Sequence, residues 1–177
     1  TLGEFYPEYK VGKEGIEKLI RNFSWPGGFP SHANPATPGV ILEGGELGYS
    51  LATAFGAAFD NKDLIVACII GDGEAETGTL AASWHSNKFL NPAKDGAVLP
   101  IVHINKYKIS GPTVFGTMSD EELVNLFRGY GYEPILVQEE NIFEDSLKAF
   151  EDAFQKIKKI QKEFRENNSK EKPVWPV

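Results

Sequence analysis

The chain reads Leu64-Ile-Val-Ala-Cys-Ile-Ile70 and continues directly into Gly71-Asp-Gly-Glu-Ala-Glu-Thr-Gly78. A short apolar run rich in β-branched residues and followed by glycines is typical of a strand buried in a parallel sheet. The glycines allow the backbone of the turn to approach a phosphate, and Asp72 places a carboxylate at the tip of the strand. This stretch therefore predicts a parallel α/β fold with a candidate binding turn at the carboxyl end of a strand.

The segments around this stretch alternate between helical and strand-like patterns. Strands are predicted at 64–70, 99–104 and 134–137, and helices at 47–59 and 79–89. A third helix is expected to begin at the capping box of Ser119 and Glu122 and to stop at Gly129, and a fourth begins at Asn141. Such alternation indicates a parallel sheet. We expect an α/β fold in which helices cover both faces of that sheet.

The chain divides into two regions of different composition. Residues 1–45 are rich in glycine and proline, so we expect a loop-rich N-terminal segment. Residues 46–177 carry the regular patterns and are expected to form an α/β domain, the two regions together making a single domain. The sequence begins without a methionine and both ends resemble cuts through continuing sequence. We therefore expect a piece of a longer protein.

Charge and composition exclude several classes of partner. The 177 residues include 18 Lys and Arg against 25 Asp and Glu, which gives a net charge of −7. Nucleic acids and anionic membranes bind to surfaces with clustered positive charge, so neither is expected as a partner. The longest apolar run is too short to span a membrane, and the N-terminus lacks the pattern of a signal peptide. Because the single cysteine, Cys68, lies inside an apolar run, we expect a buried, inert thiol and a cytoplasmic protein.

Oxygen-bearing side chains follow two predicted strands where each strand ends. Asp72 follows the first strand and Asn105 follows the second. Ligands of open parallel sheets bind at the carboxyl ends of the strands, and Mg²⁺ prefers oxygen ligands that it shares with substrate phosphates. The two side chains and a backbone carbonyl just beyond Asn105 would suit such an ion. The alternative is an ordinary strand-to-helix turn in which Asp72 caps the helix.

The arrangement Gly-Asp-Gly-Glu after an apolar strand, with an asparagine 33 residues beyond Asp72, resembles the diphosphate-binding motif of thiamine-diphosphate enzymes. This resemblance implies that Asp72, the side chain of Asn105 and the carbonyl of Tyr107 bind Mg²⁺. It also implies the fold of the diphosphate-binding domain of these enzymes for residues 46–177.

Longer blocks of the chain resemble phosphoketolases. They are Ser31-His-Ala-Asn-Pro-Ala-Thr-Pro-Gly39, Glu43-Gly-Gly-Glu-Leu-Gly-Tyr-Ser50, Asp63 through Gly78, and Ser83-Trp-His-Ser-Asn-Lys-Phe-Leu-Asn91. The chain departs from that family at three places: Ala36 replaces a usual Glu, Lys106 replaces a usual Gly, and Gly111-Pro-Thr113 replaces Asn-Pro-Thr.

The phosphoketolase resemblance implies an aldehyde-lyase that uses thiamine diphosphate and Mg²⁺. Such an enzyme cleaves xylulose 5-phosphate or fructose 6-phosphate with inorganic phosphate to acetyl phosphate and an aldose phosphate, and it acts as a homo-oligomer, a dimer or higher. His32, in an active-site loop of the N-terminal segment, would be the catalytic residue. The implied cofactor-binding residues are Gly45, Glu46, Leu47, Gly73, Glu74 and Asn105. The glutamate that activates the cofactor in the family has no counterpart here, so the isolated chain is expected to be inactive.

Two other functions remain open at this level. One is a transketolase-like ketol transferase that uses the same cofactor. The other is a non-catalytic acidic assembly domain in which the Asp72 turn is structural. A histidine in a loop is also more often solvated or structural than catalytic, which is the alternative for His32.

Overall fold

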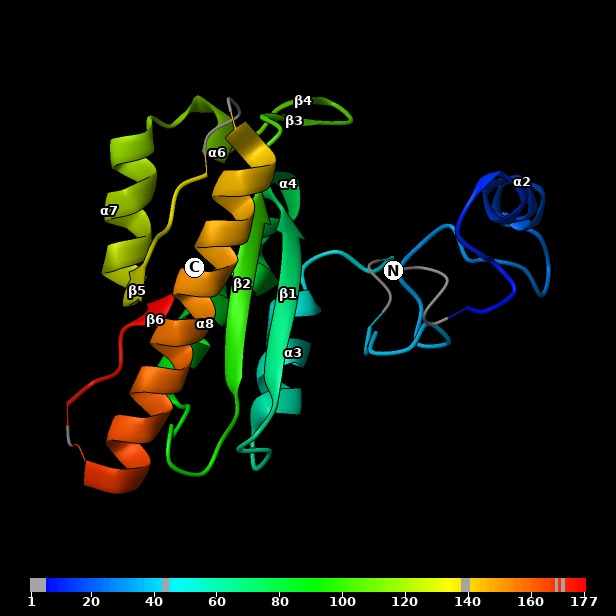
Figure 1. Cartoon of the computed structure of the whole chain (residues 1–177). Helices are drawn as coiled ribbons and strands as arrows, with labels where there is room; N and C mark the ends of the chain where they lie inside the picture. The colour runs from blue at the N-terminus through cyan, green and yellow to red at the C-terminus, as the bar shows by residue number, and fades with distance from the viewer. Residues whose placement is uncertain (1–5, 43–44, 138–140, 168, 170) are drawn as a thin grey trace. The chain divides into compact units, whose positions relative to one another are not determined.

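The computed structural model describes residues 6–42, 45–137, 141–167, 169 and 171–177 (Figure 1). The chain forms two compact units, Thr1–Glu46 and Leu47–Val177, and each is described by itself. In the first unit, helix α2 (Lys13–Asn22) is followed by turns, and the rings of Tyr6, Tyr9 and Phe29 meet edge to face. Among the residues described in both units, no helix is both long and apolar enough to cross a membrane.

The centre of the second unit is a pair of parallel strands. Strand β1 (Ile65–Gly71) pairs with β2 (Ala97–His103), and the register runs from Ile65 opposite Ala97 to Gly71 opposite His103. This pairing confirms the strands predicted at 64–70 and 99–104. Because the strands are parallel and end together, the turn after β1 and the loop after β2 leave the sheet at the same edge.

Helix α3 (Ser50–Ala58) covers one face of the two strands. Its buried side chains are Leu51, Ala54, Phe55 and Ala58. The strand side chains buried on this face include Cys68, which is 6% exposed, and burial raises the pKa of its thiol to about 11. The prediction that the Cys68 thiol is buried is therefore confirmed.

The opposite face is covered unequally. The long helix α8 (Ile142–Asn167) crosses in front of β2 in Figure 1 and buries Ala153, Ile157 and Ile160. On β1, however, Ala67 is exposed and Ile69 is 73% exposed. Within the described part of the chain, the prediction that helices cover both faces of the sheet is thus wrong for β1. A continuous apolar run cannot reveal which of its faces the rest of the chain reaches.

The third predicted strand is also wrong. Residues 134–137 form no strand; instead β5 (Tyr132–Glu133) pairs in parallel with β6 (Trp175–Pro176) near the C-terminus. The Ile135 N–H donates to the Val177 carbonyl (2.7 Å), so the main chain of the predicted segment runs beside the C-terminal residues. The strand therefore begins at Tyr132, two residues before the predicted start at residue 134. The physical reason is burial, because the pairing buries the large aromatic rings of Tyr132 and Trp175.

Helical segments connect the strands. After β1 the chain forms α4 (Asp72–Ala75), α5 (Gly78–Ser83) and the 3₁₀ helix η1 (Trp84–Lys88), so the single helix predicted at 79–89 is divided in two. Helix α7 (Asp120–Tyr130) begins with the predicted capping box, since the Ser119 hydroxyl accepts from the Glu122 N–H and the Ser119 N–H donates to the Glu122 carboxylate.

Helix α7 ends later than predicted. Gly131, with φ +94°, supplies the left-handed C-cap in place of Gly129. The helix continues to Tyr130 because its last turn stacks the Tyr130 ring on the fully buried Trp84. Phe127 and Tyr132 also meet the Trp84 ring edge to face. These aromatic contacts join η1 to α7 and β5.

Candidate functional site

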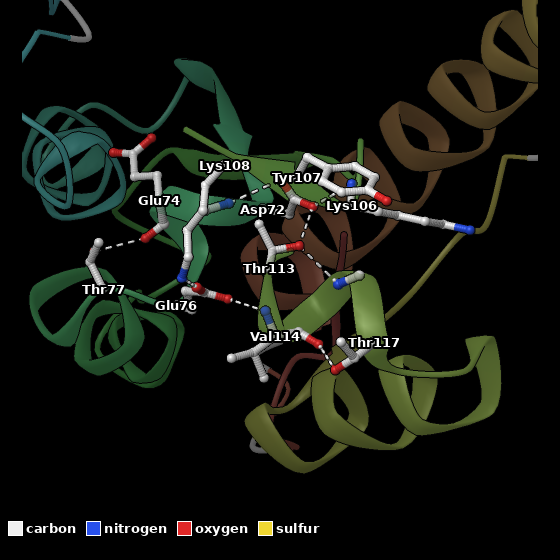
Figure 2. Close-up of polar contacts among 12 residues, drawn as sticks. Asp72, Glu74, Glu76, Thr77, Lys106, Tyr107, Lys108, Thr113, Val114 and Thr117 are labelled. Atoms are coloured by element: carbon white, nitrogen blue, oxygen red, sulfur yellow. Dashed lines mark hydrogen bonds and ion pairs between the residues drawn. The ribbon is translucent and has the colours of Figure 1, made fainter. Parts of the chain in front are cut away.

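Asp72 lies at the tip of β1 and is 2% exposed. Its Oδ2 accepts hydrogen bonds from the Lys106 N–H (2.8 Å) and the Thr113 hydroxyl (2.7 Å), and its Oδ1 accepts from the Gly73 N–H at 3.0 Å (Figure 2). A buried carboxylate needs such donors, because burying it without partners costs several kcal/mol. Through these bonds one side chain joins the turn after β1 to the loop after β2.

The loop after β2 begins with a tight turn at residues 105–107. Asn105 accepts a hydrogen bond from the Tyr107 N–H at its Oδ1 (3.0 Å), which is the geometry of an Asx turn. Lys106, in the middle, has φ +69°, a left-handed conformation that glycine adopts more readily. This conformation suits the glycine that the family resemblance implies as the usual residue at this position. The Lys106 N–H bond to Asp72 brings the turn beside the carboxylate.

The donor set of these two turns suits Mg²⁺. It combines one carboxylate (Asp72), one amide oxygen (Asn105) and one main-chain carbonyl (Tyr107), all hard oxygen ligands. Among the described residues the Asp72 Oδ1 accepts one hydrogen bond, from the Gly73 N–H, which leaves a lone pair for a further partner. The described part of the chain contains no group of three or more His, Cys, Asp or Glu side chains that could hold a metal ion. A site here would therefore depend on Asp72 as its only charged side chain.

Thr113 is a site residue that the sequence analysis missed. It is fully buried and is the N-cap of helix α6 (Val114–Thr117), whose Gly116 N–H donates to its hydroxyl (3.0 Å). The same hydroxyl donates to Asp72. A threonine after Gly-Pro and before a short apolar segment is a recognisable cap, and that signal could have identified it.

Glu76 holds the other side of the same loop. Its carboxylate forms an ion pair with Lys108 and accepts from the Val114 N–H (2.6 Å). Between these contacts, strands β3 (Tyr107–Lys108) and β4 (Gly111–Pro112) form a small antiparallel hairpin. The hydrogen bond from Lys108, and to a lesser degree that from Val114, holds the pKa of Glu76 below its ordinary value.

We expect the stability contributed by Glu76 to disappear in acid. Because its folded pKa is lowered, the carboxylate stabilises the fold above its ordinary pKa of 4.5, and this stabilisation is lost as the pH falls through the lower folded value. Glu76→Gln should therefore reduce the unfolding free energy by about 1 kcal/mol at pH 7, because Lys108 is partly solvated. Denaturant unfolding at a series of pH values should show the two proteins converging below pH 4.5. A difference that stays constant with pH would contradict this role of the charge.

Glu74 turns its carboxylate in another direction. Figure 2 shows the side chain pointing away from the Asp72 carboxylate. Its Oε1 accepts hydrogen bonds from the Gly48 N–H (3.0 Å) and the Ser50 hydroxyl (2.7 Å). The adjacent Gly73 has only ordinary contacts near its Cα, since an added Cβ would lie 3.4 Å from the Cβ of Lys108. Gly73 and Glu74 thus lie in one turn with Asp72, but Gly73 lies beside Lys108, whereas the Glu74 carboxylate lies beside Gly48 and Ser50.

The remaining predicted residues are distributed over both units. His32 is exposed in the first unit, where its Nδ1 lies 2.9 Å from the Ser31 hydroxyl. Gly45 and Glu46 end that unit, and Leu47, which is 62% exposed, begins the second. The preceding Gly44 lies outside the described residues. The structure therefore brings together Asp72, Gly73 and the 105–107 turn, while the role of His32 stays a prediction.

The second unit is a parallel α/β unit that carries a buried carboxylate and oxygen donors on adjacent strand ends, the edge at which open parallel sheets bind ligands. Comparison with known proteins identifies the family. The model of the XFP N-terminal domain matches residues 1–177, so the chain belongs to that family.

Curated relatives give the same result. Proteins named "Probable phosphoketolase" from Brucella abortus and Bradyrhizobium diazoefficiens are each 57% identical over 100% of this chain, and one from Rhodopseudomonas palustris (strain HaA2) is 58% identical over 98% of it. The chain covers 23% of the length of each of these relatives. The phosphoketolase resemblance seen in the sequence is confirmed.

Proposed function

We propose that this chain is the diphosphate- and Mg²⁺-binding portion of a thiamine-diphosphate-dependent phosphoketolase. The observation that carries the proposal is the Asp72 carboxylate, which is buried at the tip of β1 and bonded to the turn of residues 105–107 after β2. Membership of a phosphoketolase family supports the same reading and favours it over a transketolase-like enzyme or an assembly domain.

In this proposal the residues of the chain bind and orient the cofactor. Asp72, Asn105 and the Tyr107 carbonyl would hold Mg²⁺, which neutralises the diphosphate that an acidic chain could not attract by its net charge of −7. Gly73 would allow the diphosphate close to the backbone. When bound, thiamine diphosphate supplies the electron sink that permits the carbon–carbon bond of a ketose phosphate to break.

The substrate chemistry follows from the family. A ketose phosphate such as xylulose 5-phosphate or fructose 6-phosphate reacts with inorganic phosphate to give acetyl phosphate, an aldose phosphate and water. His32 would transfer a proton or hold a substrate oxygen, and the stretch of residues 45–47 would pass beside the cofactor. The partners are then a sugar phosphate and inorganic phosphate, not nucleic acid or membrane, and the enzyme would act in the cytoplasm as a homo-oligomer.

We expect acetyl phosphate formation by the full-length protein and not by the isolated 177 residues. The reason is that the site in this chain supplies oxygen ligands for a diphosphate but no residue assigned to activate the cofactor. The assay measures acetyl phosphate from xylulose 5-phosphate or fructose 6-phosphate with thiamine diphosphate, Mg²⁺ and phosphate, and repeats it with EDTA.

Three outcomes would contradict the proposal. Robust activity of the isolated chain would show that the site is complete without further residues. Transfer of the two-carbon unit to an aldose, without acetyl phosphate, would identify a transketolase-like enzyme. Absence of Mg²⁺-dependent binding of thiamine diphosphate to the full-length protein would favour a non-catalytic domain.

A further inference from the structure

The Glu74 carboxylate connects two segments that are far apart in the sequence. Its Oε1 accepts from the Gly48 N–H and the Ser50 hydroxyl, which lie 26 and 24 residues earlier in the chain. Ser50 is the first residue of α3, whereas Glu74 lies in α4, two residues after Asp72. Hydrogen bonds to a carboxylate are about twice as strong as those between neutral groups. One side chain therefore fixes the start of α3 to the turn of the candidate site.

Gly48 has little freedom to move from this position. It is buried with φ +97°, and an added Cβ would lie 2.3 Å from the Thr79 hydroxyl oxygen and 2.8 Å from that of Thr77. The main chain at Gly48 thus lies directly against the start of α5. With its N–H bonded to Glu74, this backbone is constrained both by close contact and by a charged acceptor.

Glu74 is itself held at its main chain. Its carbonyl accepts from the Thr77 N–H (3.0 Å) and from the Thr77 hydroxyl (2.7 Å). Its carboxylate points away from that of Asp72 (Figure 2). A carboxylate facing a diphosphate would also repel it. The geometry therefore favours an indirect role for Glu74 over the direct cofactor contact that the family resemblance implied.

We propose that Glu74 is a positioning residue that holds the Leu47–Gly48 backbone in place for the cofactor. This inference rests on the proposed function, in which Leu47 and Gly73 both contact thiamine diphosphate. The carboxylate fixes the chain directly after Leu47, while its own backbone is continuous with Gly73. A segment that is already ordered loses less conformational entropy when the ligand binds. Glu74 therefore raises cofactor affinity without contacting the cofactor.

The test is a calorimetric titration of the full-length protein with thiamine diphosphate at saturating Mg²⁺. Glu74→Ala should raise the Kd about tenfold, the loss typical of hydrogen bonds to a charged group, and should leave kcat at saturating cofactor within about twofold. Glu74→Gln keeps a carbonyl oxygen as acceptor and should recover most of the affinity. Ser50→Ala should weaken binding in the wild type but have no further effect in Glu74→Ala, because both changes remove the same bond.

A second readout needs no cofactor. Amide hydrogen exchange at Gly48 should become faster in Glu74→Ala, while the amides of α8 should exchange as in the wild type. Glu151→Gln, which removes an exposed carboxylate on α8, is the matched control and should change neither exchange at Gly48 nor the Kd.

The outcomes separate the two proposals. A wild-type protein that binds no thiamine diphosphate overturns the proposed function. Wild-type binding together with an unchanged Kd in Glu74→Ala overturns only the role of Glu74. A Glu74→Gln protein that loses as much affinity as Glu74→Ala, with Gly48 still protected from exchange, would identify a direct contact with the cofactor and also overturn the positioning role.

Discussion

Asp72→Asn is expected to weaken Mg²⁺-dependent binding of thiamine diphosphate by more than about 100-fold, because it removes the only charged ligand of the proposed metal site. The substitution keeps the size of the side chain. However, an amide offers one acceptor oxygen where the carboxylate offers two, and Asp72 accepts from Gly73, Lys106 and Thr113. We therefore also expect the unfolding free energy to fall by about 1–3 kcal/mol. Calorimetric titration and denaturant unfolding of the full-length protein measure the two effects.

Asp95 offers a matched control for this substitution. It is 6% exposed, and its carboxylate accepts from the Asp60 N–H (2.9 Å) and the Asn91 N–H (2.7 Å), in the loop that precedes β2. Asp95→Asn should therefore lower stability to a similar extent and leave cofactor affinity close to that of the wild type. Equal losses of affinity in the two variants would show that Asp72 acts through stability alone.

Gly116→Ala is expected to lower the unfolding free energy by about 1–3 kcal/mol, the cost of overpacking a site that cannot expand. An added Cβ would lie 2.6 Å from the Lys106 Cα and 2.8 Å from the Lys106 carbonyl oxygen. Both are backbone atoms, and the Lys106 N–H is bonded to Asp72. Helix α6 would have to shift, and this shift would strain the Thr113 hydrogen bond to Asp72. The substitution should thus also weaken cofactor binding.

Gly129 is the control for this second prediction. It lies in α7, and a Cβ added there would meet no atom within 4 Å. Gly129→Ala should stabilise the protein by up to about 1 kcal/mol, because alanine loses less backbone entropy in a helix. Chemical unfolding of the two variants should therefore give changes of opposite sign. Destabilisation of similar size in both would indicate a general intolerance of alanine rather than the contact with Lys106.

Features that depend on neighbouring residues were predictable from the sequence. The two central strands follow from apolar runs, and the capping box of Ser119 and Glu122 follows from side chains three residues apart. The third strand was not predictable, because Tyr132 pairs with Trp175, and no local pattern links residues so far apart. The α8 helix was likewise predicted from its periodicity, whereas the exposed face of β1 at Ile69 depends on which segments reach it.

The sequence by itself determined the parallel α/β class, the family and the place of Asp72 at the end of a strand, because each of these depends on a contiguous pattern of residues. Only the tertiary structure decided which groups surround that carboxylate and where Glu74 points. Thr113 reaches Asp72 across 41 residues, and Glu74 reaches Gly48 across 26. A hydrogen bond of this kind depends on the register of strands and the placement of loops to within a few tenths of an ångström. Those positions are set by the packing of the whole unit, not by the residues beside each group.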